Sequence, residues 1–161
     1  MKTALSAAQY IYDKGFTNNI VINKLLYISF GFYGASHDEY LFGDKIEAWQ
    51  YGPVIPNVYS EFKKNGFYFG HNRNELTNEE KETINDVLSL YGDKAPFLLV
   101  ELTHKKGTPW SDVYVDGEKN IEIKKESIIN YYKNFIQISD KLVKQIADED
   151  FERVMKELSK T

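Results

Sequence analysis

One stretch of the chain constrains the fold more than any other, because the helix that it predicts is apolar on nearly every side. From Ile20 to Ser36, apolar residues recur three and four residues apart, and Thr17 or Asn18 is placed to cap the first turn. Large side chains also occupy the remaining faces of this helix: Val21, Tyr27, Ile28, Phe30 and Phe32. A helix without a polar face belongs in the centre of a domain. We therefore expect the rest of the chain to pack around residues 20–36.

Shorter patterns on both sides of this segment predict a mainly α fold. Further helices are expected over residues 4–14, 56–65, 77–91, 95–104 and 125–138, the third of them behind a capping box of Thr77 and Glu80. Residues 44–52 and 67–70 predict at most a short β-hairpin or an irregular segment, and residues 105–117 predict a loop. The expected architecture is a compact bundle of about six to seven helices, forming one domain over residues 1–138.

The end of the chain predicts a helical extension. A boundary falls near Ser139, and residues 139–161 contain no Gly, Pro or Trp, so they predict one or two amphipathic helices. Their apolar residues are Leu142, Val143, Ile146, Phe151, Val154, Met155 and Leu158. An apolar helix face needs something to cover it. We expect this extension to pack on the domain or on another chain, where it helps to select a partner or forms a homodimer contact.

Charge and composition narrow the classes of partner. The net charge of −4 and the presence of only two arginines, Arg73 and Arg153, argue against nucleic acid as a partner, because phosphate and base recognition rely on clustered Lys and Arg. The chain has no Cys, which excludes disulfides and thiolate sites. Its start lacks a signal-peptide pattern, and no run approaches the about 18 apolar residues of a membrane helix. We expect a cytoplasmic protein without a membrane partner.

Catalytic and cofactor-binding motifs are absent from the sequence. There is no nucleophile elbow, zinc-protease motif, phosphate loop or dinucleotide fingerprint, and the three histidines lack the spacing of metal ligands. We therefore expect a binding protein that is not an enzyme and that needs no metal or cofactor. The alternative enzyme reading depends on His104 with a nearby carboxylate such as Glu47, since general acid–base catalysis needs only such a pair at hydrogen-bonding distance.

Two local groups of residues stand out against this background. The first contains Trp49, Tyr51, Gly52 and Pro53, a stiff aromatic corner that is either core or a shaped recognition surface. The second runs from Leu102 to Trp110 and includes His104 and Pro109. It predicts either a helix C-terminus with a buried indole, or a groove lined by His104 and Trp110 next to Trp49.

These residues and their order resemble the Panacea domain, also called the SocA-like or GepA-like domain. The resemblance covers about residues 4 to 138 in four blocks: Asn23-Lys24-Leu25-Leu26-Tyr27; Leu41-Phe42 with Ile46-Glu47-Ala48-Trp49; Tyr51 to Pro56 with Val58-Tyr59; and Thr103-His104 with Pro109-Trp110. Ile123 and Tyr131-Tyr132 fall where the closing helix of the family should be. One departure is that the family often has two lysines in its first block, whereas this chain keeps only the second, Lys24.

The resemblance implies an antitoxin domain of bacteria and their prophages that neutralises a cognate protein toxin by direct binding. The toxin would be encoded by an adjacent gene, and a protease is a further partner because a SocA-like member delivers its toxin to one. The alternative is a prophage-encoded adaptor or inhibitor that acts on a host protein. The residues that the resemblance marks as family motif or partner-binding are Lys24, Tyr27, Glu47, Trp49, Tyr51, Gly52, Pro53, Tyr59, His104, Pro109 and Trp110.

Overall fold

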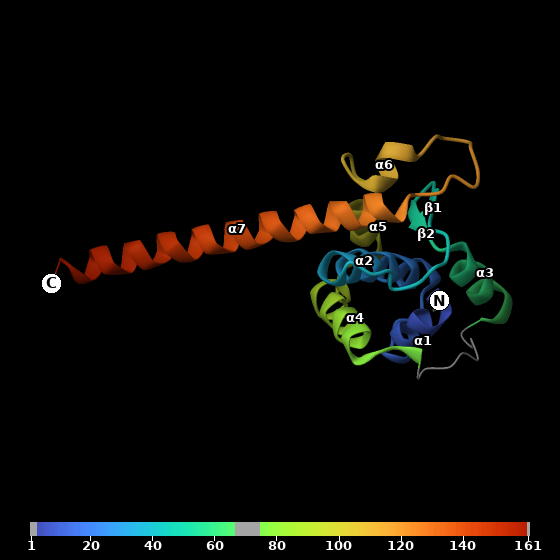
Figure 1. The fold of residues 1–161 in the computed structure, drawn as a ribbon, viewed down its shortest axis with the longest axis horizontal. Helices are drawn as coiled ribbons and strands as arrows, with labels where there is room; N and C mark the ends of the chain where they lie inside the picture. The colour runs from blue at the N-terminus through green and yellow to red at the C-terminus, as the bar shows by residue number, and fades with distance from the viewer. Residues whose placement is uncertain (1–2, 67–74, 161) are drawn as a thin grey trace.

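The fold is built around the long apolar helix α2 (Asn19–His37), as the sequence predicts (Figure 1). A computed structural model describes residues 3–66 and 75–160. The side chain of Asn18 caps α2 by accepting a hydrogen bond from the backbone N–H of Val21 at 3.1 Å. Every residue from 22 to 31 is buried. This helix therefore packs against other elements on all sides, which accounts for its lack of a polar face.

Six further helices complete the described fold. They are α1 (Ala4–Asp13), α3 (Pro56–Asn65), α4 (Asn78–Tyr91), α5 (Pro96–His104), α6 (Pro109–Val113) and α7 (Lys125–Leu158). Helices α1, α3, α4, α5 and α7 all contact α2. Over the described ranges the fold thus contains seven helices and one small sheet, which confirms the mainly α prediction.

Local sequence signals account for where several helices begin. In α4 the predicted capping box is present: the Thr77 hydroxyl accepts from Glu80 N–H at 3.2 Å, and Glu80 accepts from Thr77 N–H at 2.8 Å. Helix α3 begins at Pro56, whose fixed φ suits the first helical position. The capping box satisfies backbone N–H groups of α4 that have no partner within the helix, whereas Pro56 simply has no N–H at that position.

The small sheet is a tight antiparallel hairpin of β1 (Glu47–Trp49) and β2 (Gly52–Val54). Residues 121–123 lie along the other edge of β1, where Ala48 N–H donates to Ile121 C=O and Ile123 N–H donates to Ile46 C=O, each at 2.8 Å. The chain just before α7 therefore completes the sheet. The second predicted β or irregular segment, residues 67–70, lies outside the described residues.

Two sequence-based expectations differ from the structure. Residues 105–117 were expected to form a loop, but they contain α6, in which the Thr108 hydroxyl accepts from Ser111 N–H and Pro109 occupies the first turn. A helix of five residues is too short to show a periodic pattern. The chain also passes Ser139 without a break, because no Gly or Pro interrupts the helix there and α7 runs unbroken for 34 residues.

Helix α7 packs closely on α2 through two glycines. A Cβ atom on Gly31 would overlap the ring of Tyr132, and one on Gly34 would overlap the side chain of Ile129. Beyond this contact α7 leaves the bundle and projects into solvent (Figure 1). All residues from 140 to 160 are exposed.

Candidate functional site

A buried lysine ties the central helix to the hairpin. Lys24 is 1% exposed, and its Nζ donates a hydrogen bond to the backbone oxygen of Pro53 at 2.9 Å. Burial lowers the pKa of the Lys24 ammonium from 10.5 to about 8. Desolvation is the cause, because a low-dielectric surrounding disfavours the charged form. Lys24 therefore links the motif block in α2 to the motif block that contains Pro53 through a buried hydrogen bond.

Asn23, the residue before Lys24, makes a second connection between α2 and the chain that follows the hairpin. The side-chain oxygen of Asn23 accepts from Ile55 N–H at 2.9 Å, and its amide group donates to the backbone oxygen of Asn19 at 3.0 Å. Asn23 and Lys24 thus hold the chain on both sides of Val54. The path from Pro53 to Ile55 is set by polar bonds to α2 as well as by packing.

Gly52 is required at the start of β2 for two reasons. Its φ is +117°, a value that residues other than glycine rarely adopt. The following proline alone would predict an extended conformation with a negative φ. A Cβ atom there would also lie 3.1 Å from Lys24 Cε and 3.3 Å from the hydroxyl oxygen of Thr103. The Gly-Pro pair therefore lets the hairpin approach both α2 and α5.

The two motif groups that the sequence singled out are joined by a hydrogen bond. The indole N–H of Trp110, in α6, donates to the backbone oxygen of Trp49, in β1, at 2.6 Å. The Trp110 ring stacks on Tyr114 at 4.4 Å between centroids and packs at a tilt on His104 at 5.1 Å. Pro109, the first residue of α6, is buried. Trp110 thus connects α5 and α6 to the hairpin.

Trp49 is half-buried, so it is neither a core residue nor a free surface residue. Its indole N–H donates to the Glu47 carboxylate at 3.0 Å, and its ring meets the edge of Tyr59 at 4.9 Å between centroids. Tyr51, in the turn of the hairpin, is 63% exposed. The hairpin therefore presents two aromatic side chains, one half-buried and hydrogen-bonded and one exposed.

Two polar groups of the motif lie buried without a hydrogen-bond partner among the described residues: the Tyr27 hydroxyl and Nδ1 of His104. Tyr27 is 1% exposed and its ring meets the edge of Tyr132, and burial raises the pKa of its phenol. Tyr27 belongs to the core on the α7 side of α2. The other motif residues lie around the hairpin, whereas Tyr27 packs against Tyr132 of α7.

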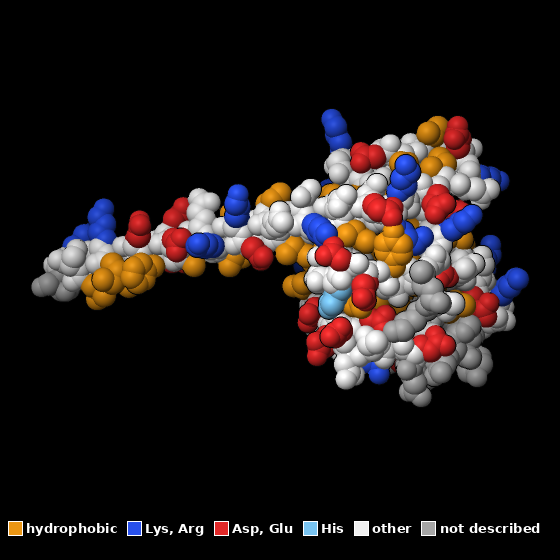
Figure 2. Space-filling view, viewed as in Figure 1, with side chains coloured by type: hydrophobic (Ala, Val, Ile, Leu, Met, Phe, Trp, Pro, Cys, Tyr) orange, Lys and Arg blue, Asp and Glu red, His pale blue; other side chains and the backbone are white. Residues whose placement is uncertain are grey.

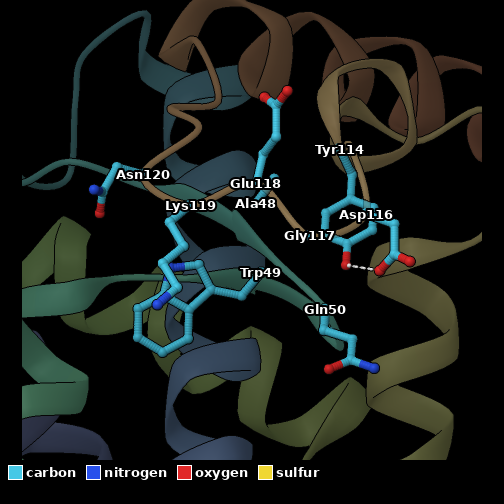
Figure 3. A pocket seen from close by; sticks show the side chains of 9 residues that line it. All are labelled: Ala48, Trp49, Gln50, Tyr114, Asp116, Gly117, Glu118, Lys119 and Asn120. Atoms are coloured by element: carbon cyan, nitrogen blue, oxygen red, sulfur yellow. Dashed lines mark hydrogen bonds between the residues drawn. The ribbon is translucent and has the colours of Figure 1, made fainter.

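An open hollow lies beside Trp49 (Figure 3). Its volume is about 430 Å³, within the range of about 300–1,000 Å³ that is typical of binding pockets. The hairpin contributes Ala48, Trp49 and Gln50, and the segment after α6 contributes Tyr114 and residues 116–120. Neither His104 nor Trp110 is among the lining residues, so the groove that the sequence predicted next to Trp49 exists with a different second wall.

The second wall was not predicted from the sequence. Figure 3 shows the Trp49 indole on one side and the Tyr114 phenol on another, with Glu118 and Lys119 carried by the loop between them. The Tyr114 hydroxyl donates to Asp116 at 3.2 Å. The only signal in the sequence was the turn-forming residue Gly117, which has a φ of +82°. A turn signal locates a loop but does not show what the loop faces.

The described part of the chain contains no cluster of three or more His, Asp or Glu residues that could hold a metal ion. Within that same part, no helix is both long and apolar enough to cross a membrane. The lining of the hollow combines the aromatic rings of Trp49 and Tyr114 with the charged residues Asp116, Glu118 and Lys119.

Comparison with known proteins places the site within a family. Residues 22–111 match the family described as "Antitoxin SocA-like, Panacea domain". The matched region begins inside α2 and ends inside α6, so it includes Lys24, the hairpin and Trp110. The second wall of the hollow and the whole of α7 lie outside it.

The chain is also 30% identical over 115 residues to a protein named Antitoxin SocA from Caulobacter vibrioides (strain NA1000 / CB15N). The alignment covers 62% of this chain and 61% of SocA, so the chain spans about three fifths of the length of this relative. No solved structure matches the chain. Because the family match takes in more than half of the chain and every contact that joins its two motif groups, this protein belongs to the SocA-like Panacea domain family.

Proposed function

We propose that this chain is an antitoxin that neutralises a protein toxin by binding it directly, and that the toxin is encoded by a neighbouring gene. The observation that carries the proposal is the position of the hollow beside Trp49: it opens on the hairpin that hydrogen bonds from Lys24 and Trp110 hold to α2 and α6. Rigid aromatic side chains lose little entropy on binding and are frequent anchors at protein interfaces.

The chemistry of the hollow suits a protein partner. Its lining combines aromatic rings with side chains of both charge signs, a combination that fits an apolar or aromatic side chain surrounded by polar residues. Tyr51 extends the same surface at the turn of the hairpin. We call Trp49, Gln50, Tyr51, Tyr114 and Lys119 the recognition surface.

We propose binding rather than catalysis as the activity. What supports this is that the Glu47 carboxylate accepts the indole N–H of Trp49, while the His104 ring packs on Trp110. The Glu47 carboxylate is thus bonded to Trp49, and His104 Nδ1 has no hydrogen-bond partner among the described residues, so the two groups do not form the hydrogen-bonded pair that acid–base catalysis would need. Replacing His104 with Ala is expected to leave neutralisation intact whenever the variant remains folded, and loss of neutralisation by a folded variant would favour catalysis.

Co-expression with the neighbouring gene tests the proposal. We expect the chain to restore growth of cells that express the toxin, and a complex to co-purify. Tyr51→Ala, combined with Lys119→Glu, should weaken the complex by about 30-fold or more, since an interface anchor contributes about 2 kcal/mol or more. The matched control is Phe97→Ala, which removes an equally exposed aromatic ring (68%) from α5.

A neighbouring protein that is neither toxic nor bound would contradict the proposal. If the chain instead binds a host protein and no toxin gene lies beside it, the alternative of a prophage-encoded adaptor or inhibitor takes its place. If the double variant and the wild-type chain bound the toxin with equal affinity, the toxin would have to contact a surface other than the recognition surface.

A further inference from the structure

The outer edge of β1 is paired along only part of its length. Residues 121–123 bond to it through Ala48 N–H and Ile46 C=O. This pairing stops at Asn120, whose φ of +61° turns the chain away from the extended path of a strand. The residues before Asn120 instead form the second wall of the hollow. The hollow therefore lies beside the end of β1 that residues 121–123 do not reach.

Two backbone groups of the hairpin face this unpaired edge. In an antiparallel pair, the N–H and C=O groups of successive residues point to alternate sides. Trp49 is paired with Gly52 next to the two-residue turn, so its own groups face β2 and those of Ala48 and Gln50 face outward. Ala48 N–H donates to Ile121. Over the described ranges, neither Ala48 C=O nor Gln50 N–H makes a hydrogen bond, so the edge keeps one free acceptor and one free donor.

We propose that the hollow binds an extended segment of the toxin, one residue of which donates its N–H to Ala48 C=O and accepts a hydrogen bond from Gln50 N–H. The inference rests on the proposed function and names the kind of toxin segment that the recognition surface binds. An extended chain added to a sheet edge satisfies the free backbone groups of that edge. A helix has its own backbone groups bonded internally and would leave both groups of the edge without a partner.

The bonds that the hairpin already makes set the direction of the segment. In an antiparallel segment, the residue that donates to Ala48 C=O would also accept from Ala48 N–H, a position that Ile121 occupies. In a parallel segment, one residue bonds to both Ala48 C=O and Gln50 N–H. The segment therefore runs parallel to β1, with this residue opposite Trp49. On its N-terminal side it must leave the edge, because Glu122 is paired with Glu47 there.

The side chain of the residue opposite Trp49 follows from the lining of the hollow. Side chains directly opposite each other on neighbouring strands point to the same face of a sheet, so this one lies on the Trp49 side. Trp49 and Tyr114 both line the hollow, and their rings favour an aromatic or aliphatic side chain. Asp116 and Lys119 carry opposite charges beside them, which suits polar residues of both signs next to that position in the toxin.

The projecting part of α7 offers a different kind of surface. Figure 2 shows hydrophobic side chains gathered along one edge of this helix. Its backbone N–H and C=O groups bond within the helix, so they do not select the backbone conformation of a partner. At the unpaired end of β1, by contrast, the backbone itself requires an extended partner.

A pair of substitutions at one position isolates the Gln50 N–H. Gln50→Pro removes the side chain and the N–H, whereas Gln50→Ala removes the side chain alone. The turn accepts proline at this position, because Gln50 has a negative φ and proline is favoured at the first central position of such turns. By calorimetric titration with the purified product of the neighbouring gene, Gln50→Pro should bind at least about tenfold more weakly than Gln50→Ala. Thermal unfolding of both variants shows whether each is folded.

Amide hydrogen exchange of the wild-type chain gives a second measurement that needs no substitution. We expect the Gln50 N–H to exchange rapidly in the free chain and at least about tenfold more slowly in the complex. Ala48 N–H is the matched control, because its bond to Ile121 should protect it in both states. In nuclear Overhauser spectra of the complex, close contacts between Hα protons of β1 and of the toxin would indicate an antiparallel segment and contradict the parallel direction.

The outcomes separate this inference from the proposed function. If the product of the neighbouring gene forms no complex, the proposed function fails and the inference fails with it. If a complex forms but the Gln50 N–H exchanges as fast as in the free chain, or folded Gln50→Pro binds as tightly as Gln50→Ala, only the extended segment is overturned. Protection of the Gln50 N–H in the isolated chain that increases with chain concentration would mean that a second copy occupies the edge, which also overturns the inference.

Discussion

Replacing Lys24 with Met should change how the stability of the protein depends on pH. In the folded protein burial lowers the pKa of Lys24 from 10.5 to about 8. The unfolded chain therefore holds this proton more tightly than the folded one. Between pH 8 and pH 10.5 the unfolded state binds more protons, so the contribution of Lys24 to the free energy of unfolding rises with pH.

The size of this effect follows from the shift. A change of one pKa unit corresponds to about 1.4 kcal/mol, so the buried ammonium costs about 3 kcal/mol at pH 7, and about 2 kcal/mol of this should be recovered by pH 9.5. Met has a similar length and no charge, but it leaves the backbone oxygen of Pro53 without its hydrogen bond, which costs about 1–3 kcal/mol. We expect Lys24→Met to be at least as stable as the wild type at pH 7.

The assay is urea unfolding of the wild type and Lys24→Met at pH 7 and pH 9.5. The wild type should gain about 2 kcal/mol relative to the variant between these pH values. Lys94→Met removes an exposed lysine and should show no such change. Because the wild type and Lys24→Met share all other titrating groups, the effect of those groups on stability cancels in the difference between the two proteins. A difference that does not change with pH would refute the reasoning, because it would mean that Nζ remains hydrated in the folded protein.

Three further substitutions test other contacts of the fold. Gly31→Ala introduces a methyl group where the Tyr132 ring lies, so it should lower the free energy of unfolding by about 1–3 kcal/mol, measured by urea unfolding. Trp110→Phe keeps an aromatic ring but removes the hydrogen bond to the Trp49 backbone oxygen, and should cost about 1–2 kcal/mol in the same assay. Thr77→Ala removes the cap of α4 and should cost about 1 kcal/mol, seen as a lower thermal midpoint.

Matched substitutions separate these effects from general ones. Ser36 is an exposed residue of α2, so Ser36→Ala should leave the free energy of unfolding unchanged. If Gly31→Ala and Ser36→Ala lowered it equally, the close approach of α7 to Gly31 would be contradicted. Thr83 lies within α4 rather than at its cap, and its hydroxyl donates to the backbone oxygen of Glu79, so Thr83→Ala removes no cap. A cost as large as that of Thr77→Ala would argue against the capping role.

The family motif was predictable from the sequence, but the way in which its residues act was not. Trp49, Gly52 and Trp110 stand out by residue type and spacing alone. Whether Trp49 is core or surface depends on how much of its ring α3 and the segment after α6 cover, and no local pattern encodes this. The structure leaves the ring half-buried, with its backbone oxygen bound to Trp110.

Local physics determined the elements of this protein. The apolar pattern of α2, the capping box of α4 and the proline at the start of α3 each involve residues close together in the chain, so they can be recognised in the sequence. The tertiary structure decided three things that depend on residues far apart in the chain. It buried Lys24 beneath Pro53, it placed Tyr114 across from Trp49, and it carried α7 past Ser139 into solvent. Each depends on contacts that form, or fail to form, only when the whole bundle is assembled, and that is the physical reason why the sequence pattern alone did not contain them.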